Sequence, residues 1–215
     1  MVDTPQSLSM PGLEDGRKAD EPCTIVIFGA SGDLTARKLI PALYHLYTEG
    51  QMPASFRVVG FARREKTDES WREEMRVGIE KYSRTSSVDA AQWQDFANNL
   101  SYHRGDLTDA DAYGGLAGRL AGFDDAALTG NLVFYLAISP SLFGEVVDQL
   151  HAAGLLKRFE EGDSNWQRVV VEKPFGHDLR SAQLLNNHLI RHARERQIFR
   201  IDHYLGKETV QNIMM

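Results

Sequence analysis

A glycine-containing segment, GASGDL at residues 29–34, stands directly after a short apolar run and before a helical pattern. Glycines let the backbone turn tightly and approach a pyrophosphate, and free N–H groups at the start of the next helix attract anions. The spacing is also consistent with a plain strand-to-helix turn, but its place after the first expected strand favours a nucleotide site. The candidate cofactor-binding residues are Gly29, Ser31, Gly32, Asp33 and Leu34. Lys38, one turn into the helix, could add charge near the phosphates, and its alternative is a solvated surface lysine.

Two arginines, Arg63 and Arg64, follow the second apolar run at residues 56–61. Enzymes that use NAD commonly place an acid at this point, on the ribose 2′-hydroxyl, and no acid stands here. Two guanidiniums can instead clamp a 2′-phosphate through charge-assisted, bidentate hydrogen bonds. The alternative is an exposed basic pair without a ligand. We interpret both arginines as cofactor-binding residues and predict NADP as the coenzyme.

A lysine follows a later apolar run, in the segment EKPFG at residues 172–176. Lys173 precedes a proline that fixes the turn, so its ammonium could donate into the crevice at the end of the sheet. The alternative is a routine charged pair of Glu172 and Lys173 leading into a loop. We interpret Lys173 as a hydrogen-bond donor into this crevice.

The segment RIDHYLGKE at residues 200–208 gathers hydrogen-bond donors. If it is helical, His203, Tyr204 and Lys207 share one face, and such a face suits a phosphate. The neighbouring Asp202 could accept a hydrogen bond from a histidine or a substrate hydroxyl. The alternative is a polar helix start capped by Asp202, and the residues alone leave both interpretations open.

Other polar and aromatic residues are interpreted as structural. The segment GDLTD at 105–109 resembles an adenine-edge contact of short-chain dehydrogenases, but it is equally typical of a turn and helix cap. His188 and His192 stand at i, i+4 with no evident third ligand, so we expect surface residues and no metal site. The tryptophans are most simply packing anchors: Trp71, Trp93 and Trp166.

The elements that must position these residues alternate along the chain. Strands are expected at residues 24–28, 56–61, 100–103, 132–138, 168–171 and 197–201. Helices are expected around residues 39–47 and at 68–82, 90–98, 110–120, 141–153 and 179–196. This alternation predicts an α/β fold with a doubly wound, mostly parallel sheet of the Rossmann type.

The same pattern divides the chain. Residues 1–22 are rich in proline and glycine and are expected to form a flexible tail, and residues 23–201 to form the NADP-binding domain. Residues 202–215 would begin a second, truncated substrate and dimerisation domain. The helical pattern at 207–215 stops without a C-terminal cap signal, so we expect the chain to be cut short.

Composition excludes several function classes. Of 215 residues, 42% are hydrophobic and 25% charged, which is typical of a globular protein. The net charge of −6 argues against a nucleic-acid partner. The one cysteine, Cys23, has no partner for a disulfide, and no apolar run approaches the length of a membrane span. The first 22 residues lack the apolar stretch of a signal peptide, so we expect a cytoplasmic protein without membrane contact.

Three segments together, at 29–34, 172–176 and 200–208, resemble the coenzyme-binding part of the glucose-6-phosphate dehydrogenase family. The resemblance covers about residues 23–215. It implies an NADP-dependent oxidoreductase that transfers hydride from the anomeric carbon of glucose 6-phosphate and forms 6-phosphogluconolactone, the first step of the oxidative pentose phosphate pathway. It also implies a homo-oligomer, formed through the larger domain that this chain lacks.

The resemblance also implies residue roles. Lys173 would contact coenzyme and sugar, Arg63 would bind the 2′-phosphate, and the 6-phosphate would be held by His203, Tyr204 and Lys207. Asp202 would be catalytic by orienting a histidine base that lies beyond residue 215, so we expect the isolated chain to be inactive. The alternative is an NADP-binding sensor or scaffold of short-chain dehydrogenase type, without catalysis. The length of the natural chain distinguishes the two, because a sensor would end near Met215.

Overall fold

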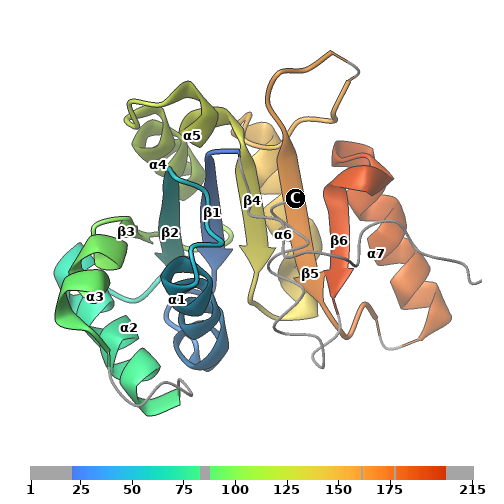
Figure 1. The fold of residues 1–215 in the computed structure, drawn as a ribbon. Helices are drawn as coiled ribbons and strands as arrows, with labels where there is room; N and C mark the ends of the chain where they lie inside the picture. The colour runs from blue at the N-terminus through green and yellow to red at the C-terminus, as the bar shows by residue number, and fades with distance from the viewer. Residues whose placement is uncertain (1–20, 83–87, 161, 177, 202–215) are drawn as a thin grey trace, which may run out of the picture.

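The structure is a computed structural model and describes residues 21–82, 88–160, 162–176 and 178–201. Among these residues, six strands form one sheet in the order β3-β2-β1-β4-β5-β6 (Figure 1). The strands are β1 (Cys23–Phe28), β2 (Phe56–Ala62), β3 (Leu100–Arg104), β4 (Leu132–Leu136), β5 (Gln167–Glu172) and β6 (Ile198–Ile201). All five pairings are parallel, so the doubly wound sheet expected from the sequence is confirmed.

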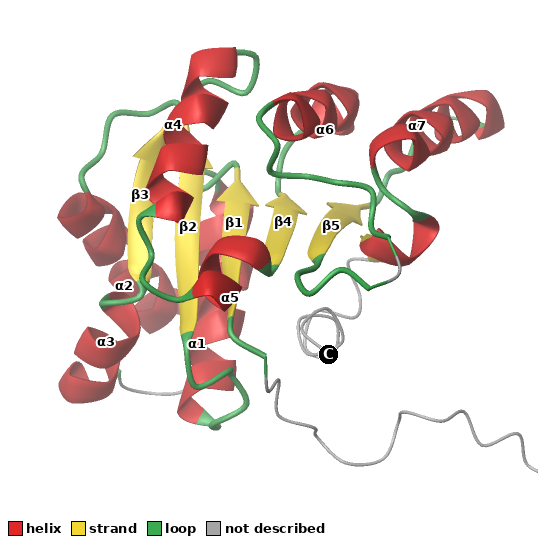
Figure 2. Ribbon diagram, turned by 90° about the horizontal axis from the view of Figure 1, so that it is seen from above, coloured by secondary structure: helices red, strands yellow, loops and turns green. Residues whose placement is uncertain are grey.

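Helices cover both faces of this sheet. They are α1 (Ile40–Thr48), α2 (Asp68–Tyr82), α3 (Ala90–Ala97), α4 (Ala110–Ala121), α5 (Ala126–Gly130), α6 (Phe143–Ala152) and α7 (Leu179–His192). Three short turns complete the described elements: η1 (Thr35–Leu39), η2 (Pro140–Leu142) and η3 (Glu195–Gln197). Figure 2 shows α4, α6 and α7 on one side of the strands and α1, α2 and α3 on the other. None of these helices, within the described residues, is long and apolar enough to cross a membrane.

Alternation along β1 divides the core into two layers. Ile25 and Ile27 point to the face covered by α1, α2 and α3, whereas Val26 and Phe28 point to the face covered by α4, α6 and α7. All six residues of β1 and all five of β4 are buried. A strand covered on both faces has no polar side, which is why these segments read as continuous apolar runs.

Two expected elements run at least two residues past their observed C-terminal ends, and one helix was missed. The expected strand at 132–138 ends at Leu136, because its partner β1 ends at Phe28, opposite Leu136, and the chain beyond leaves the sheet. The expected helix at 179–196 ends at His192, since Gln197 is buried and bonded to backbone carbonyls of two other segments. Helix α5 was missed because its five residues are too short to show periodicity.

Candidate coenzyme site

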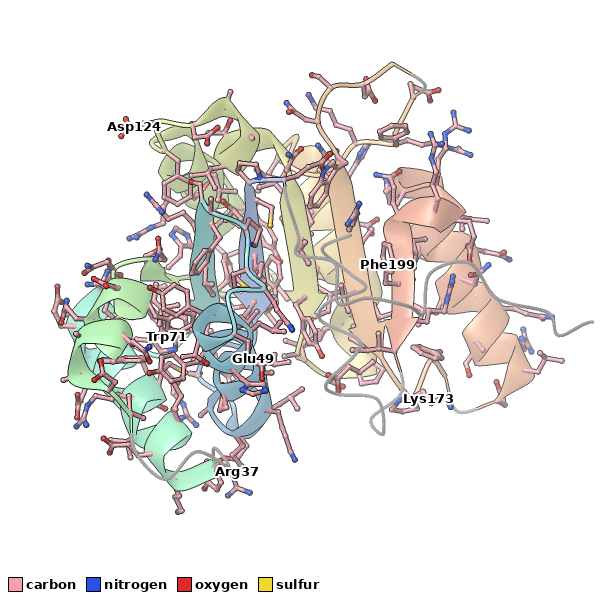
Figure 3. The ribbon with its side chains drawn as sticks, viewed as in Figure 1. Arg37, Glu49, Trp71, Asp124, Lys173 and Phe199 are labelled. Atoms are coloured by element: carbon pink, nitrogen blue, oxygen red, sulfur yellow. The ribbon has the colours of Figure 1, made fainter. Side chains whose placement is uncertain are left out.

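A cleft of about 460 Å³ opens at the carboxyl ends of β1, β4 and β5. Strand order reverses between β1 and β4, and open α/β sheets bind their ligands at such a switch point. Figure 3 shows Arg37 and Lys173 at the edge toward which the strands point. The cleft is lined by Asp33, Leu34, Arg37, Lys38, Leu136, Ala137, Ile138, Pro140, Phe143, Glu172 and Lys173.

The turn after β1 requires glycine at its first position. Gly29 has φ +86°, and a Cβ there would lie 2.2 Å from the carbonyl oxygen of Ala137. The amides of Gly29 and Ala30 both donate to the carbonyl of Phe61, at 3.0 and 3.2 Å, and the amide of Gly32 donates to the Gly29 carbonyl at 2.8 Å. The backbone is therefore folded tightly between β2 and the end of β4. Gly32 stays exposed on this turn, and a pyrophosphate could approach the main chain there.

Helix α2 holds this turn from behind. The indole Nε1 of the fully buried Trp71 donates to the Ala30 carbonyl at 3.0 Å. The indole ring fits at this position because residue 60 of β2 is glycine: a Cβ on Gly60 would lie 2.5 Å from the ring. A Cβ on Gly78 would lie 2.5 Å from the carbonyl of Ala36, so α2 also touches the helix start directly. Trp71 is a packing anchor, as expected, and in addition a support of the turn.

The helix after the turn begins irregularly. Residues Thr35–Leu39 form a π-helical turn in which the amide of Ile40 donates to the carbonyl of Thr35, and α1 follows at once. Pro41 has no amide hydrogen to give to an α-helical bond, and an adjacent π turn is one way to accommodate that. The turn leaves Arg37 and Lys38 exposed on the lining of the cleft, and Arg37 pairs with Asp33 at 3.4 Å.

The two arginines after β2 lie beside the glycine turn. Both are exposed, and Arg64 donates to the carbonyl of Ser31 at 3.3 Å. Their backbone is fixed from β3, because the hydroxyl of Tyr102 donates to the carbonyls of Ala62 and Arg64, at 3.2 and 2.7 Å. The Arg63 guanidinium adds to the hydrogen bonds from Thr108 that lower the pKa of Asp106. Positive charge thus stands at the end of β2, one strand away from the cleft.

The opposite wall of the cleft comes from β5. Lys173 is exposed on the lining, and its backbone amide donates to the carbonyl of Ile201 in β6. Its neighbour Glu172 accepts a hydrogen bond from the hydroxyl of Tyr135, which is buried in β4. Burial and this carboxylate raise the pKa of Tyr135, so the phenol stays a neutral donor that orients Glu172. The peptide bond between Lys173 and Pro174 is cis.

The structure thus brings one group of predicted residues into a single cleft: Asp33, Leu34, Lys38 and Lys173. Gly29, Ser31, Gly32, Arg63 and Arg64 lie on the adjoining turn and strand end rather than on the cleft lining. Four other predicted residues, Asp202, His203, Tyr204 and Lys207, lie outside the described residues, as do residues 1–20.

Sequence reasoning missed two residues of this region. Arg37 lines the cleft, and its i, i+4 spacing from Asp33 was a readable signal. Tyr135 gave no such signal, because an aromatic residue inside an apolar strand indicates only core. Its contact with Glu172 joins two strands that lie far apart in sequence.

The strand order, the glycine turn and the cleft at the switch point together define a dinucleotide-binding domain of the Rossmann type. Residues 26–212 match the family model described as glucose-6-phosphate dehydrogenase, NAD binding domain. The chain belongs to the glucose-6-phosphate dehydrogenase family and contains its NAD(P)-binding domain.

Individual relatives agree with this assignment. Glucose-6-phosphate 1-dehydrogenase of Chlamydia muridarum is 44% identical over 194 residues, which cover 90% of this chain and 38% of that protein. The Bacillus subtilis enzyme of the same name is 42% identical over 190 residues, or 88% of this chain and 37% of that protein. Among solved structures, a glucose-6-phosphate dehydrogenase in complex with its substrate glucose-6-phosphate has a TM-score of 0.75 at 38% identity, covering 90% of this chain and 39% of that one. The chain therefore spans well under half the length of these relatives.

Proposed function

We propose that the protein represented by this chain oxidises glucose 6-phosphate to 6-phosphogluconolactone with NADP, and that these residues supply its coenzyme-binding domain. The observation that carries the proposal is the cleft at the switch point, which adjoins a turn that accepts only glycine at position 29. This observation stands in a chain of the glucose-6-phosphate dehydrogenase family.

The residues present fit a dinucleotide. The space that a Cβ on Gly29 would occupy is taken by the carbonyl of Ala137, which lines the cleft, so glycine lets the turn close against the end of β4. A pyrophosphate would approach the main chain of this turn at the exposed Gly32. Lys38 and Arg37 add positive charge to the lining, and Arg63 and Arg64 supply the donors for a 2′-phosphate. When bound, the nicotinamide of the coenzyme accepts a hydride from the sugar.

The sugar would lie against the β5 wall. There Lys173 can donate from the cleft lining to a sugar hydroxyl and fix its orientation, and Tyr135 holds the neighbouring Glu172. On the family's pattern, the 6-phosphate would go to His203, Tyr204 and Lys207. As the hydrogen of the anomeric carbon leaves as hydride, the proton of the anomeric hydroxyl must pass to a base within about 2.6–3.2 Å. His203, which would bind the 6-phosphate, cannot serve both ends of the sugar. We therefore propose that a histidine outside these 215 residues is the base, oriented by Asp202.

Coenzyme titration tests the arginine assignment. A hydrogen bond to a charged group contributes about 1.5–3 kcal/mol, so Arg63→Ala should weaken NADP binding roughly 10- to 100-fold and leave NAD nearly unchanged. Arg191→Ala is the matched control, because Arg191 is exposed in the last turn of α7 and its loss changes the net charge equally. An equal loss for NADP and NAD would mean that Arg63 does not meet the 2′-phosphate.

Turnover tests the activity itself. In a protein that extends this chain to the length of its relatives, we expect NADPH to form with glucose 6-phosphate, and Lys173→Ala to lower kcat as well as sugar affinity. The 215-residue chain should bind NADP without turnover, since loss of a general base typically costs about 10²–10⁴-fold. A longer protein that binds NADP but never oxidises the sugar would favour a sensor or scaffold instead.

A further inference from the structure

Helices α6 and α7 lie side by side on one face of the sheet (Figure 2) and bring three polar side chains together. Nε2 of His188 and Nε2 of His192 each lie 2.8 Å from the same oxygen, Oδ1 of Asp148. The two imidazoles come from one face of α7, four residues apart, and the carboxylate comes from α6. The three ligand atoms lie within 4.8 Å of one another. The sequence showed no third group beside His188 and His192, and the packing of α6 on α7 supplies one in the Asp148 carboxylate.

The surrounding structure holds these imidazoles in place. A Cβ on Gly144 would lie 3.2–3.3 Å from the His188 ring, so the glycine in the first turn of α6 lets that ring pack against the helix. The His192 ring packs on the ring of His151, with centroids 4.4 Å apart. His151 is itself anchored through Nδ1 to the carbonyl of Leu156, at 3.1 Å. The cluster is thus ordered from both helices.

We propose that Asp148, His188 and His192 form a binding site for a divalent transition-metal ion of the zinc type. Two imidazoles and one carboxylate are a ligand set that Zn²⁺ accepts, with water in the fourth position. Zn–N and Zn–O bonds of about 2.0–2.2 Å put tetrahedral ligand atoms about 3.3 Å apart. Each imidazole nitrogen therefore needs to move about 0.5 Å from the carboxylate oxygen to admit the ion. The two nitrogens, now within 4.8 Å of each other, need to stand about 3.3 Å apart.

The site is open enough to load and lies away from the coenzyme cleft. The exposed fractions of the side chains are 33% for His188, 21% for His192 and 47% for Asp148, so solvent reaches all three. None of the three lines the cleft, although Phe143, at the start of α6, does. A bound ion would join α6 to α7 and so clamp the two helices that cover β4, β5 and β6.

Zinc titration of the full 215-residue chain tests the proposal. We expect one equivalent of Zn²⁺ in competition with a chromogenic chelator, and a visible d–d band when Co²⁺ is added. Loss of a group that merely hydrogen-bonds to a metal ligand typically lowers metal affinity about 10- to 100-fold. Asp148→Asn and His192→Gln remove proposed ligands themselves, so each should weaken zinc binding at least tenfold. At Zn²⁺ 100-fold above its Kd, the melting temperature should rise by about 5–10 °C.

The control is His45→Gln. Nε2 of His45 lies 2.8 Å from a Glu49 oxygen, so this pair matches one arm of the cluster but lacks the second imidazole. The His45→Gln substitution should leave the zinc affinity unchanged. Circular dichroism checks that every variant is folded. The proposal is overturned if the wild-type chain takes up no stoichiometric zinc. It is equally overturned if folded Asp148→Asn and His192→Gln bind zinc as the wild type does. Neither result bears on the coenzyme titrations, so the two proposals fail separately.

Discussion

Substituting alanine for Gly29 tests whether the turn after β1 depends on the close approach of Gly29 to the main chain that follows β4. The added Cβ would lie 2.2 Å from the carbonyl oxygen of Ala137, and φ is +86°. Left-handed backbone costs an L-residue about 1–2 kcal/mol, and forcing atoms into a packed site costs a further ~1–3 kcal/mol. Gly29→Ala should therefore lower the free energy of unfolding by about 2–5 kcal/mol, a large share of the ~5–15 kcal/mol of a typical domain.

The chain offers a control that carries the backbone strain without the clash. Gly50, at the end of α1, has φ +68°, and nothing lies within 4 Å of a Cβ built there. Gly50→Ala should cost only the ~1–2 kcal/mol of strain. Urea unfolding of both variants gives the two free energies, and their difference isolates the contact with Ala137. NADP titration of the same samples should show weaker binding for Gly29→Ala alone, because only that turn adjoins the cleft.

Two results would refute this reasoning. If Gly29→Ala costs no more than Gly50→Ala, the carbonyl of Ala137 does not press on the turn. If Gly29→Ala unfolds easily but binds NADP with wild-type affinity in its folded fraction, the turn supports the fold and does not form the coenzyme site.

Three further predictions concern buried or half-buried side chains. Trp71→Phe removes the indole donor to Ala30, so it should lower the free energy of unfolding in urea by at least about 1–3 kcal/mol and weaken NADP binding. An unchanged NADP affinity would show that the Trp71 hydrogen bond supports the fold but not the coenzyme site. Burial raises the pKa of Cys23 to about 12, so a thiol reagent at pH 8 should label it only in denaturant, and rapid labelling of the native chain would contradict its burial. Burial lowers the pKa of His103 below its ordinary 6.5, so the unfolded chain binds the proton more readily and the free energy of unfolding should fall as pH drops below 6.5. In unfolding measured between pH 5 and 7.5, His103→Gln should reduce this loss of stability, and an unchanged dependence on pH would exclude His103 as its source.

The fold could be predicted because its signals are local. A strand buried on both faces reads as an apolar run, as in Cys23–Phe28, and a covering helix shows its spacing within about fifteen residues, as in Asp68–Tyr82. Connections that are right-handed and un-knotted then leave few topologies. Boundaries were less accurate where tertiary contacts decide them, as at Leu136 and at His192.

The candidate sites also differ in how far their signals are local in the sequence. The glycine turn and the arginines after β2 are short segments at strand ends, so their types and places suffice to suggest a nucleotide. The Trp71 support depends on an indole reaching a carbonyl 41 residues away, and the Asp148–His188 contact joins residues 40 apart. His188 and His192 alone look like surface residues, because two imidazoles at i, i+4 lack a third ligand. What makes them a candidate site is the packing of α6 on α7, with Gly144 leaving room for the ring, and no local pattern encodes that approach. Sequence reasoning therefore suggests candidate sites that one strand end creates, and it misses candidate sites that two packed helices create.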